Sequence, residues 1–362
     1  MSSSISVYAG KTALKEISKN GLSSQQIKVM AGASGGPKWF TLFGLDKYLF
    51  GEFFKDRQQV LHTIGSSAGS WRLACLAQKD PVAAISRLAH FYSNERYSKR
   101  ASTNEISDKA DILLKKVLAE SGAKEIVENP IIQSHFIVAR AKGLAASENR
   151  LVQLLGLITA AGFNATSANS LKLFFERFVF HSSLNKENPA SHYFNYPDSN
   201  TQYVALDETN VHAVLMASGA IPLILRGIKD IPGAVSGAYR DGGIIDYHLD
   251  INFGEQGLIL YPHFFPKIKP GWFDKSLSYR RAKLANFDRV VLITPSPEHV
   301  AQLPFGKISD RSDFTSLETE QRINYWQTVL KESERLADDF ANLVEKDIGM
   351  EQVRPIEEML VK

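Results

Sequence analysis

The stretch VLHTIGSSAGSWRLACLA, residues 60–77, leads from an apolar, strand-like run into an apolar, helix-like run through a cluster of glycine and serine. Its centre, GSSAG, fits the pattern G-x-S-x-G, which between a strand and a helix is typical of a nucleophile elbow, a sharp turn that exposes one serine. A serine in such a turn has a strained backbone, and bulky side chains two positions away would collide. Ser67 is therefore the candidate nucleophile, and Gly65 and Gly69 are the elbow glycines. A plain Gly/Ser turn at the start of a helix is the alternative.

The rest of the chain repeats this alternation of strand-like and helix-like segments. Short apolar runs, with helical segments between several of them, occur at 26–32, 58–65, 134–143, 201–208, 257–264 and 288–296. Such runs are typical of strands in a parallel sheet that is covered on both faces. The predicted fold is therefore α/β, with three layers in the order α/β/α and a mostly parallel central sheet with helices on both faces. The segment 165–183 is expected to form a helix with a broad apolar face.

The composition is that of a folded protein without a dominant charge. The 362 residues are 44% hydrophobic and carry a formal net charge of +3, so no overall basic field favours nucleic acid as a partner. The single cysteine excludes an internal disulfide and a cysteine-based zinc cluster. The N-terminal residues do not have the pattern of a secretory signal, and the longest apolar windows are shorter than the roughly 20 residues of a spanning helix. A cytoplasmic location is therefore expected.

A change of character after Pro304 predicts the domain organisation. Over residues 316–348, apolar residues recur at three-, four- and six-residue spacings, which indicates one or two amphipathic helices that end at Gly349. We expect a main domain over residues 1–310 and an amphipathic helical extension over residues 311–362 that packs on it.

A second glycine-rich stretch, GASGGPKW at residues 32–39, follows an apolar run of its own. It does not fit a Walker phosphate loop, because proline precedes the lysine where that loop needs glycine, and tryptophan follows it where a hydroxyl is needed. With no side chains at Gly35 and Gly36, their N–H groups can approach a developing oxyanion, and a helix that starts near Lys38 adds the positive end of its dipole. Lys38 itself is predicted to give electrostatic support; a solvated helix residue is the alternative.

The candidate proton acceptor lies in AYRDGGIIDYHLD, residues 238–250. Asp241 precedes two glycines, so neighbouring backbone N–H groups can hold its carboxylate against a serine hydroxyl. An ordinary Asp-Gly turn is the alternative. Asp246 and Asp250 are nearby rivals for the role of general base.

Histidines offer a different scheme. His248, His263 and His299 all follow Asp241, which is the chain order of an α/β-hydrolase triad. A Ser-His-Asp esterase is therefore an alternative, in which the base is a histidine.

Four motifs, in order along the chain, resemble those of the patatin-like phospholipases, lipid acyl hydrolases that use a Ser-Asp dyad. SGGPK resembles their glycine-rich oxyanion loop, GSSAG their elbow, MASGAIP their helix-to-loop signature and DGG the motif of their dyad aspartate. The set runs from Gly35 to Gly243. The resemblance implies that Ser67 is the nucleophile, Asp241 the general base, and the N–H groups of Gly35 and Gly36 the oxyanion hole. Four residues of the third motif are implied only as packing near the site: Ala217, Ser218, Ile221 and Pro222.

The chain departs from the family pattern in two places. Ala33, Ser34 and Trp39 stand where the oxyanion loop of the family usually has an aspartate, a further glycine, and a glycine after its basic residue. Trp39 is expected either to narrow the acyl pocket or to pack against the helix. After DGG, the sequence IIDYH replaces a frequent Asn-Pro pair. Neither change removes a catalytic group.

The function implied by the resemblance is a serine lipid acyl hydrolase of the phospholipase A or lysophospholipase type. It would form an acyl-enzyme on Ser67, need no metal or cofactor, and act on a phospholipid or another lipid ester. Residues 266–283 hold six basic side chains and three aromatic ones, which favours transient contact with an anionic membrane surface, with a solvated loop as the alternative. No motif indicates nucleic acid as a partner. A protein of the same fold that binds lipid or a partner without turnover is the remaining alternative.

Overall fold

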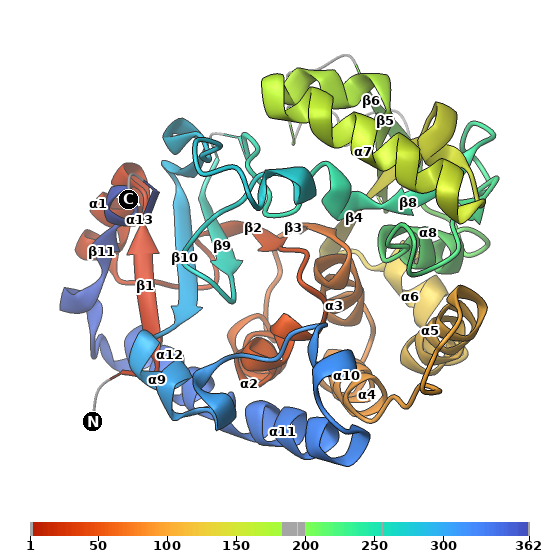
Figure 1. Ribbon diagram of the computed structural model, residues 1–362. Coiled ribbons are helices and arrows are strands. Elements are labelled where there is room, and N and C mark those ends of the chain that lie inside the picture. The colour runs from red at the N-terminus through yellow and green to blue at the C-terminus, as the bar shows by residue number, and fades with distance from the viewer. Residues whose placement is uncertain (1–2, 183–193, 195–199, 255, 361–362) are drawn as a thin grey trace.

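A computed structural model describes residues 3–182, 194, 200–254 and 256–360. A mixed, mostly parallel sheet crosses the molecule, with helices packed around it (Figure 1). Its strands run in the order β11-β1-β10-β9-β2-β3-β4-β5-β6, and β8 pairs with β4 and β7. The predicted α/β class with a mostly parallel sheet is confirmed.

The elements have the following bounds. The strands are β1 (Ile5–Ala9), β2 (Ile27–Gly32), β3 (Leu61–Ser66), β4 (Ile132–Ala141), β5 (Phe175–His181), β6 (Thr201–Ala205), β7 (Ile228–Lys229), β8 (Ala238–Asp241), β9 (Leu258–Pro262), β10 (Val290–Pro295) and β11 (Arg354–Pro355). The helices are α1 (Lys11–Asn20), α2 (Phe43–Tyr48), α3 (Ala68–Leu76), α4 (Pro81–Ser93), α5 (Thr103–Leu118), α6 (Gly122–Glu128), α7 (Arg150–Thr166), α8 (Val211–Ser218), α9 (Pro297–Gln302), α10 (Asp313–Ser316), α11 (Thr319–Glu332), α12 (Glu334–Lys346) and α13 (Glu357–Leu360).

The strands in the middle of the sheet are largely apolar and do not alternate between apolar and polar residues, because both of their faces are covered. Strands β10, β9, β2, β3 and β4 are each parallel to their neighbours in this order, and nearly all of their residues are buried. A strand covered on both faces needs apolar side chains at odd and even positions alike. Each of the six predicted strand segments overlaps an observed strand. A 3₁₀ helix, Gly36–Leu42, follows β2 and helix α3 follows β3, both near the predicted helix starts.

The helix predicted over 165–183 is wrong. Residues 165 and 166 end helix α7. The rest of the described segment forms a short 3₁₀ turn, Ala168–Leu173, and then strand β5, and residue 183 lies outside the described residues. Strand β5 pairs with β4 on one edge and β6 on the other, and six of its seven residues are buried. In its sequence, FERFVFH, apolar and polar residues do not alternate, so the strand has no period-2 signal and resembles the broad apolar face of a helix.

The C-terminal part of the chain forms the two expected amphipathic helices, α11 and α12, and they pack against the segment after β2. The Ser333 hydroxyl accepts a hydrogen bond from the Gly44 backbone nitrogen at 2.8 Å, and the rings of Phe340 and Tyr48 are 6.0 Å apart. The last strand, β11, then pairs with β1 at the sheet edge. The residues after 310 therefore pack on the helical segment after β2, and β11 extends the sheet at its edge.

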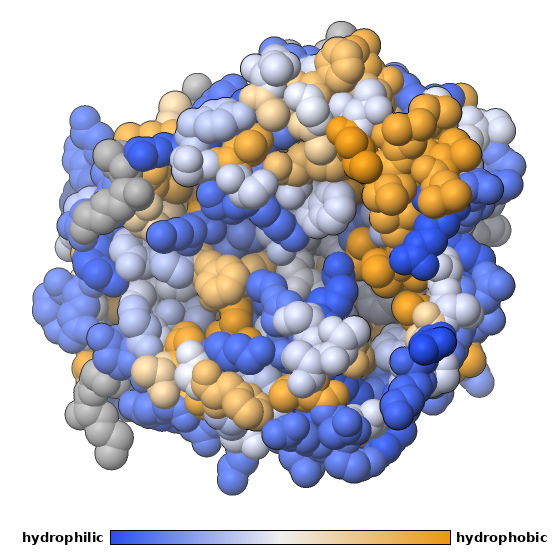
Figure 2. Space-filling model, in the orientation of Figure 1, coloured by the Kyte–Doolittle hydropathy of each residue, from blue (hydrophilic) through white to orange (hydrophobic). Residues whose placement is uncertain are grey.

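One surface is unusually apolar. Helix α7 exposes a row of large hydrophobic side chains, visible as the orange area at the upper right of Figure 2, over the helix labelled α7 in Figure 1. Among the described residues, no helix combines the length and the apolar character that crossing a bilayer requires.

Candidate active site

The turn between β3 and α3 holds Ser67 in a left-handed backbone conformation, with φ 53° and ψ −127°. The two flanking glycines are needed for close approach of backbones. A Cβ on Gly69 would lie 2.0 Å from the backbone oxygen of Gly32, and one on Gly65 would lie 2.7 Å from the backbone carbon of Gly69. The strained conformation is thus fixed by backbone packed directly on backbone, which is the geometry expected of an elbow.

Strand β4 brings Asp241 to this turn. Strand β3 ends at Ser66, which pairs with Ile137 of β4. On the same side of β4, the antiparallel strand β8 ends at Asp241, which pairs with Val138, the next residue of β4. The ends of β3 and β8 therefore meet head to head along β4, although Ser66 and Asp241 are far apart in the sequence.

The two side chains at this meeting point are hydrogen-bonded. The Ser67 hydroxyl donates to Oδ2 of Asp241 at 2.8 Å, and Oδ1 of Asp241 accepts from the backbone nitrogen of Gly243 at 2.7 Å. Both side chains are buried. Burial raises the pKa of Asp241 from 3.8 to about 6, although the hydrogen bonds from Ser67 and Gly243 oppose this rise. The carboxylate is therefore a stronger base than an ordinary aspartate.

The backbone of Ser67 is held by a residue of the MASGAIP motif. The Ser218 hydroxyl accepts a hydrogen bond from the Ser67 backbone nitrogen at 3.0 Å and lies 2.8 Å from the backbone oxygen of Ile137. Ser218 thus has a specific positioning contact, whereas the sequence implied packing alone. The neighbouring serines point elsewhere, because Ser66 donates to the Asp246 backbone oxygen and Ser70 to the Gly65 backbone oxygen.

The glycine-rich loop lies against the elbow. Gly35 and Ser67 line one cavity, and Gly36 and Ser67 line another. Gly36 has φ +55°, and a Cβ on Gly35 would meet the ring of Phe264 at 2.4 Å. Within the part of the chain that the structure describes, neither glycine N–H donates a hydrogen bond. Within residues 34–38, the N–H groups of Ser34 and Lys38 are bonded to backbone oxygens and proline has none, so Gly35 and Gly36 hold the free backbone donors of this loop.

Lys38 is not a solvated helix residue. It is half-buried and forms an ion pair with Asp310, and it belongs to the 3₁₀ turn Gly36–Leu42 that leads into α2. Burial, together with the nearby guanidinium of Arg311, lowers the pKa of Lys38 to about 8. Asp310 and Arg311 both line the cavity that contains Ser67, so the proposed boundary between residues 310 and 311 passes through the wall of one site.

Two cavities meet at Ser67. A polar cavity of about 140 Å³ contains Asp241 and a group of charged side chains. An apolar cavity of about 620 Å³ lies on the other side. Its large apolar lining residues include Trp39, Trp71, Leu88, Leu113, Met216 and Phe314. Trp39 is fully buried and lines this cavity, so it both packs the turn and bounds the space.

The rival bases are occupied elsewhere. Asp246 forms a buried two-bond ion pair with Arg177, at 2.6 and 3.1 Å, and Asp250 accepts a hydrogen bond from Asn286 at 2.8 Å. Neither carboxylate lines a cavity that contains Ser67.

The three histidines that follow Asp241 in the chain, His248, His263 and His299, are buried. His248 accepts from the Lys269 backbone nitrogen at 2.9 Å, and Nδ1 of His263 is hydrogen-bonded to the backbone of Phe265. None of His248, His263 and His299 lines either cavity beside Ser67. In the described part of the chain, no three or more His, Cys, Asp or Glu residues are arranged to hold a metal ion.

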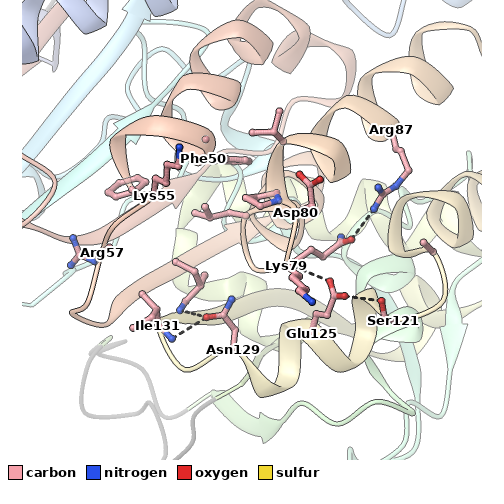
Figure 3. A pocket seen from close by; sticks show the side chains of 18 of the residues that line it. Phe50, Lys55, Arg57, Lys79, Asp80, Arg87, Ser121, Glu125, Asn129 and Ile131 are labelled. Carbon is pink, nitrogen blue, oxygen red and sulfur yellow. Dashed lines mark hydrogen bonds between the residues drawn. The ribbon is translucent and has the colours of Figure 1, made fainter.

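A larger cavity of about 770 Å³ lies at the opposite end of the strands (Figure 3). Its lining residues include Arg57, before β3, and Asn129, before β4. Its polar groups already hold the surrounding loops, since Glu125 accepts from the Lys79 backbone and from Ser121, and Asn129 accepts from two backbone nitrogens. Ligand sites of parallel sheets lie beyond the carboxyl ends of the strands, where Ser67 is.

Comparisons with known proteins assign no family to the chain. No protein-family model matches the chain, and the search of curated proteins finds no match. Among solved structures, human GIVD cytosolic phospholipase A2 aligns with 12% identity and a TM-score of 0.41, over 96% of this chain and 63% of that chain. This chain therefore spans less than two-thirds of the length of that neighbour. A likeness this distant assigns no family.

Proposed function

We propose that the protein is a serine hydrolase of lipid esters in which Ser67 is the nucleophile and Asp241 is the general base. The observation that carries this proposal is the 2.8 Å hydrogen bond between the two side chains, at the junction of an apolar and a polar cavity. A serine hydroxyl needs an adjacent base to become a nucleophile, and a base is most effective when its pKa is near the working pH. The pKa of about 6 for Asp241 meets that requirement.

The steps of the reaction follow from the positions of these groups. The Ser67 oxygen attacks the ester carbonyl while its proton passes to Oδ2 of Asp241. The N–H groups of Gly35 and Gly36 stabilise the negative oxygen of the tetrahedral intermediate, and stabilisation of this kind usually accelerates such reactions more than any other single effect. Asp241 then protonates the leaving alcohol, and an acyl-enzyme remains. A water molecule gives its proton to Asp241, attacks the acyl group and releases the acid, and the proton returns to Ser67.

The lipid character of the substrate is supported by the apolar cavity. At about 620 Å³ it falls within the range of small-molecule sites, and it has room for an acyl chain. Lys38 would support the site through the field of its charge. A phospholipase A or lysophospholipase type of reaction fits a site with one apolar and one charged side. The distant structural neighbour is itself named as a phospholipase A2.

Transient contact with a membrane surface is part of the proposal. Trp272 and Lys275, from the basic and aromatic segment 266–283, line the polar cavity, so this segment borders the route by which a lipid would reach Ser67.

Hydrolysis of a short-chain nitrophenyl ester tests the proposal. We expect Ser67→Ala and Asp241→Ala each to abolish turnover while the fold persists, and Ser66→Ala to retain turnover. Full activity of Ser67→Ala would contradict the assignment. Loss of activity in His248→Ala, His263→Ala or His299→Ala, with the fold intact, would favour a Ser-His-Asp triad instead. A folded protein without activity on any ester would favour the alternative of a binding protein.

A further inference from the structure

Three basic side chains line the small polar cavity beside Ser67: Lys38, Lys275 and Arg311. Lys38 is paired with Asp310. Within the described part of the chain, Lys275 and Arg311 have no carboxylate within salt-bridge distance. The carboxylates that line this cavity are those of Asp310 and Asp241, so three basic side chains face two acidic ones and the lining keeps an excess of one positive charge.

The two unpaired cations are positioned by aromatic rings and by the oxyanion loop. The Lys275 ammonium lies 3.8 Å from the ring centre of Tyr247 and 5.8 Å from that of Trp272, which are cation–π distances. The Arg311 guanidinium packs over the loop, with Nη2 3.2 Å from where a Cβ on Gly36 would be. Arg311 lines both the polar and the apolar cavity, so it lies where the two halves of a bound ester would meet.

A phosphate group matches this wall in charge and in size. Arginine presents a planar fork of donors that suits phosphate oxygens, and lysine adds a point charge. The polar cavity, at about 140 Å³, is much smaller than the apolar cavity of about 620 Å³, so an acyl chain fits better in the apolar one and a phosphate suits the polar one. The acyl chain has its own space in the apolar cavity on the other side of Ser67.

We propose that the polar cavity binds the phosphate of a phosphate-bearing acyl ester, with Arg311 and Lys275 as its ligands and the acyl chain in the apolar cavity. This inference rests on the proposed function, because it orients the ester around Ser67. The same phosphate chemistry is available from a lipid headgroup and from free inorganic phosphate, and the experiment below separates these sources.

The test compares two esters with the same acyl chain, an acylglycerol phosphate and the uncharged acylglycerol. We expect kcat/KM to favour the phosphate ester by at least about tenfold, and Arg311→Gln or Lys275→Met to reduce that ratio by about tenfold each. The matched control is Lys124→Met, which removes a positive charge from the exposed face of α6 and should leave the ratio unchanged. Inorganic phosphate should inhibit hydrolysis competitively.

Binding to the Ser67→Ala protein, measured by calorimetry, separates this inference from the proposed function. If the wild type hydrolyses neither ester but Ser67→Ala prefers the phosphate ester and loses that preference with Arg311→Gln, the phosphate site stands and the hydrolase proposal fails. Equal binding of the two esters, or a preference that Arg311→Gln leaves intact, would overturn the phosphate site. If inorganic phosphate inhibits but the protein does not prefer the phosphate ester over the uncharged ester, the cavity is not a site for the phosphate of a substrate.

A different observation carries a second proposal, on helix α7. Leu151, Leu155 and Ile158 are 77%, 56% and 61% exposed, and they lie at the spacing of one helix face. Other large apolar side chains exposed on or beside this helix are Leu144, Val152, Leu154, Phe163 and Leu173. An apolar face of this kind marks an interaction surface, because soluble proteins rarely leave a contiguous one in water.

The surroundings of α7 indicate what covers this face. The basic segment 266–283 packs along its C-terminal end, where Tyr279 donates to the Ala165 backbone oxygen and Arg280 to that of Asn164. At its other end, the side chain of Gln153 accepts from the backbone nitrogen of Leu223, next to residues that line both cavities at Ser67. The basic segment 266–283 therefore lies at the C-terminal end of α7, and residues next to the lining of the two cavities at Ser67 lie near its N-terminal end.

We infer that the exposed face of α7 docks on an anionic lipid bilayer. Its apolar side chains would enter the interface, and the basic side chains beside it would contact the headgroups, as in interfacial helices. This arrangement would bring the mouth of the two cavities to the lipid. The proposed lipid-ester function explains why the protein would dock, but the docking can be tested without any enzymatic activity.

Co-sedimentation with vesicles tests the docking. We expect the protein to bind vesicles of phosphatidylcholine with phosphatidylserine more tightly than vesicles of phosphatidylcholine alone. Leu155→Glu with Ile158→Glu should weaken binding by at least about tenfold, and so should Leu151→Glu alone, which alters the most exposed position at the start of the helix. Ile112→Glu is the matched control, since Ile112 is 52% exposed on α5. Unchanged binding in the α7 variants would overturn the proposal, and so would a dimer in sedimentation velocity that those variants dissociate.

Discussion

The hydroxyl of Ser218 accepts a hydrogen bond from the backbone nitrogen of Ser67 at 3.0 Å. It lies 2.8 Å from the backbone oxygen of Ile137, so one hydroxyl ties the elbow, helix α8 and strand β4 together. This contact has two consequences. It helps to hold a non-glycine residue at φ 53°, and it occupies the N–H of the candidate nucleophile, so this N–H is not free to join the proposed oxyanion donors Gly35 and Gly36.

Ser218→Ala should reduce both stability and turnover. The change leaves a buried N–H and a buried carbonyl without this partner, which typically costs about 1–3 kcal/mol of unfolding free energy. Because the hydroxyl positions Ser67 and does not touch substrate, we expect kcat to fall by about tenfold with little change in KM. Denaturant unfolding and steady-state kinetics measure the two effects. Ser23→Ala, on the surface, is the control, and wild-type kinetics in Ser218→Ala would contradict the positioning role.

The pH dependence of activity should follow Asp241. Its pKa of about 6 is raised by burial, and the unprotonated form is the base, so kcat/KM should rise with pH and be half-maximal near pH 6. Initial rates from pH 4 to pH 8 check this. A profile with its midpoint near 4 would mean that the carboxyl group is solvated.

The same group should affect stability in the opposite direction. The folded protein keeps the Asp241 proton to a higher pH than the unfolded chain, so the stabilising contribution is complete below about pH 4 and is lost as the pH rises through about 6. The change is on the order of 3 kcal/mol, from about 1.4 kcal/mol for each pH unit between the two pKa values. Asp241→Asn should remove this component from the unfolding free energy measured between pH 4 and pH 7. An identical pH dependence in the variant would contradict this assignment.

The buried ion pair between Arg72 and Asp46 should stabilise the fold only when both charges are present. Arg72 of α3 donates to Asp46 of α2 through Nε at 2.7 Å and Nη2 at 2.6 Å, and both residues are fully buried. Asp46→Ala leaves an uncompensated charge and should lower the unfolding free energy by about 3–5 kcal/mol. The double variant Asp46→Leu with Arg72→Met should be less destabilised than Asp46→Ala. A double-mutant cycle in urea measures the coupling, and additive losses would contradict a paired role.

The apolar cavity should set the acyl-chain preference. Ala110 of α5 lines it, and Ala110→Phe would fill part of the space. Each methylene that no longer enters loses about 0.8 kcal/mol of burial, so kcat/KM for a twelve-carbon acyl ester should fall at least about tenfold relative to a four-carbon ester. A series of nitrophenyl esters measures this ratio. A chain-length profile that Ala110→Phe leaves unchanged would show that the acyl group binds elsewhere.

The parts of the fold and site that could be predicted from the sequence are those with local signatures. The strand segments and the elbow around Ser67 depend on neighbouring residues, because a tight turn or a buried strand limits the residue types nearby. The glycines of the DGG and SGGPK motifs are predictable for the same reason. Strand β5 was not predictable, since burial on both faces erases the alternation that separates a strand from a helix.

The contacts that complete the site could not be predicted because they join distant parts of the chain. Asp310 pairs with Lys38 from 272 positions away, and Lys275 and Arg311 enter the cavity from loops without a motif. The role of Ser218 was similarly hidden. Its motif indicated a place near the site, but the hydrogen bond to Ser67 depends on how α8 packs against β4, which no local pattern specifies.

The most direct test of the central claim is the mass of the protein, and of its proteolytic peptides, after treatment with a fluorophosphonate. An activated serine beside its base attacks the phosphorus and displaces fluoride from it, so we predict a single adduct on Ser67, formed rapidly in the wild type, slowly in Asp241→Ala and never in Ser67→Ala. An unmodified wild-type protein, or an adduct that persists in Ser67→Ala, would contradict the account.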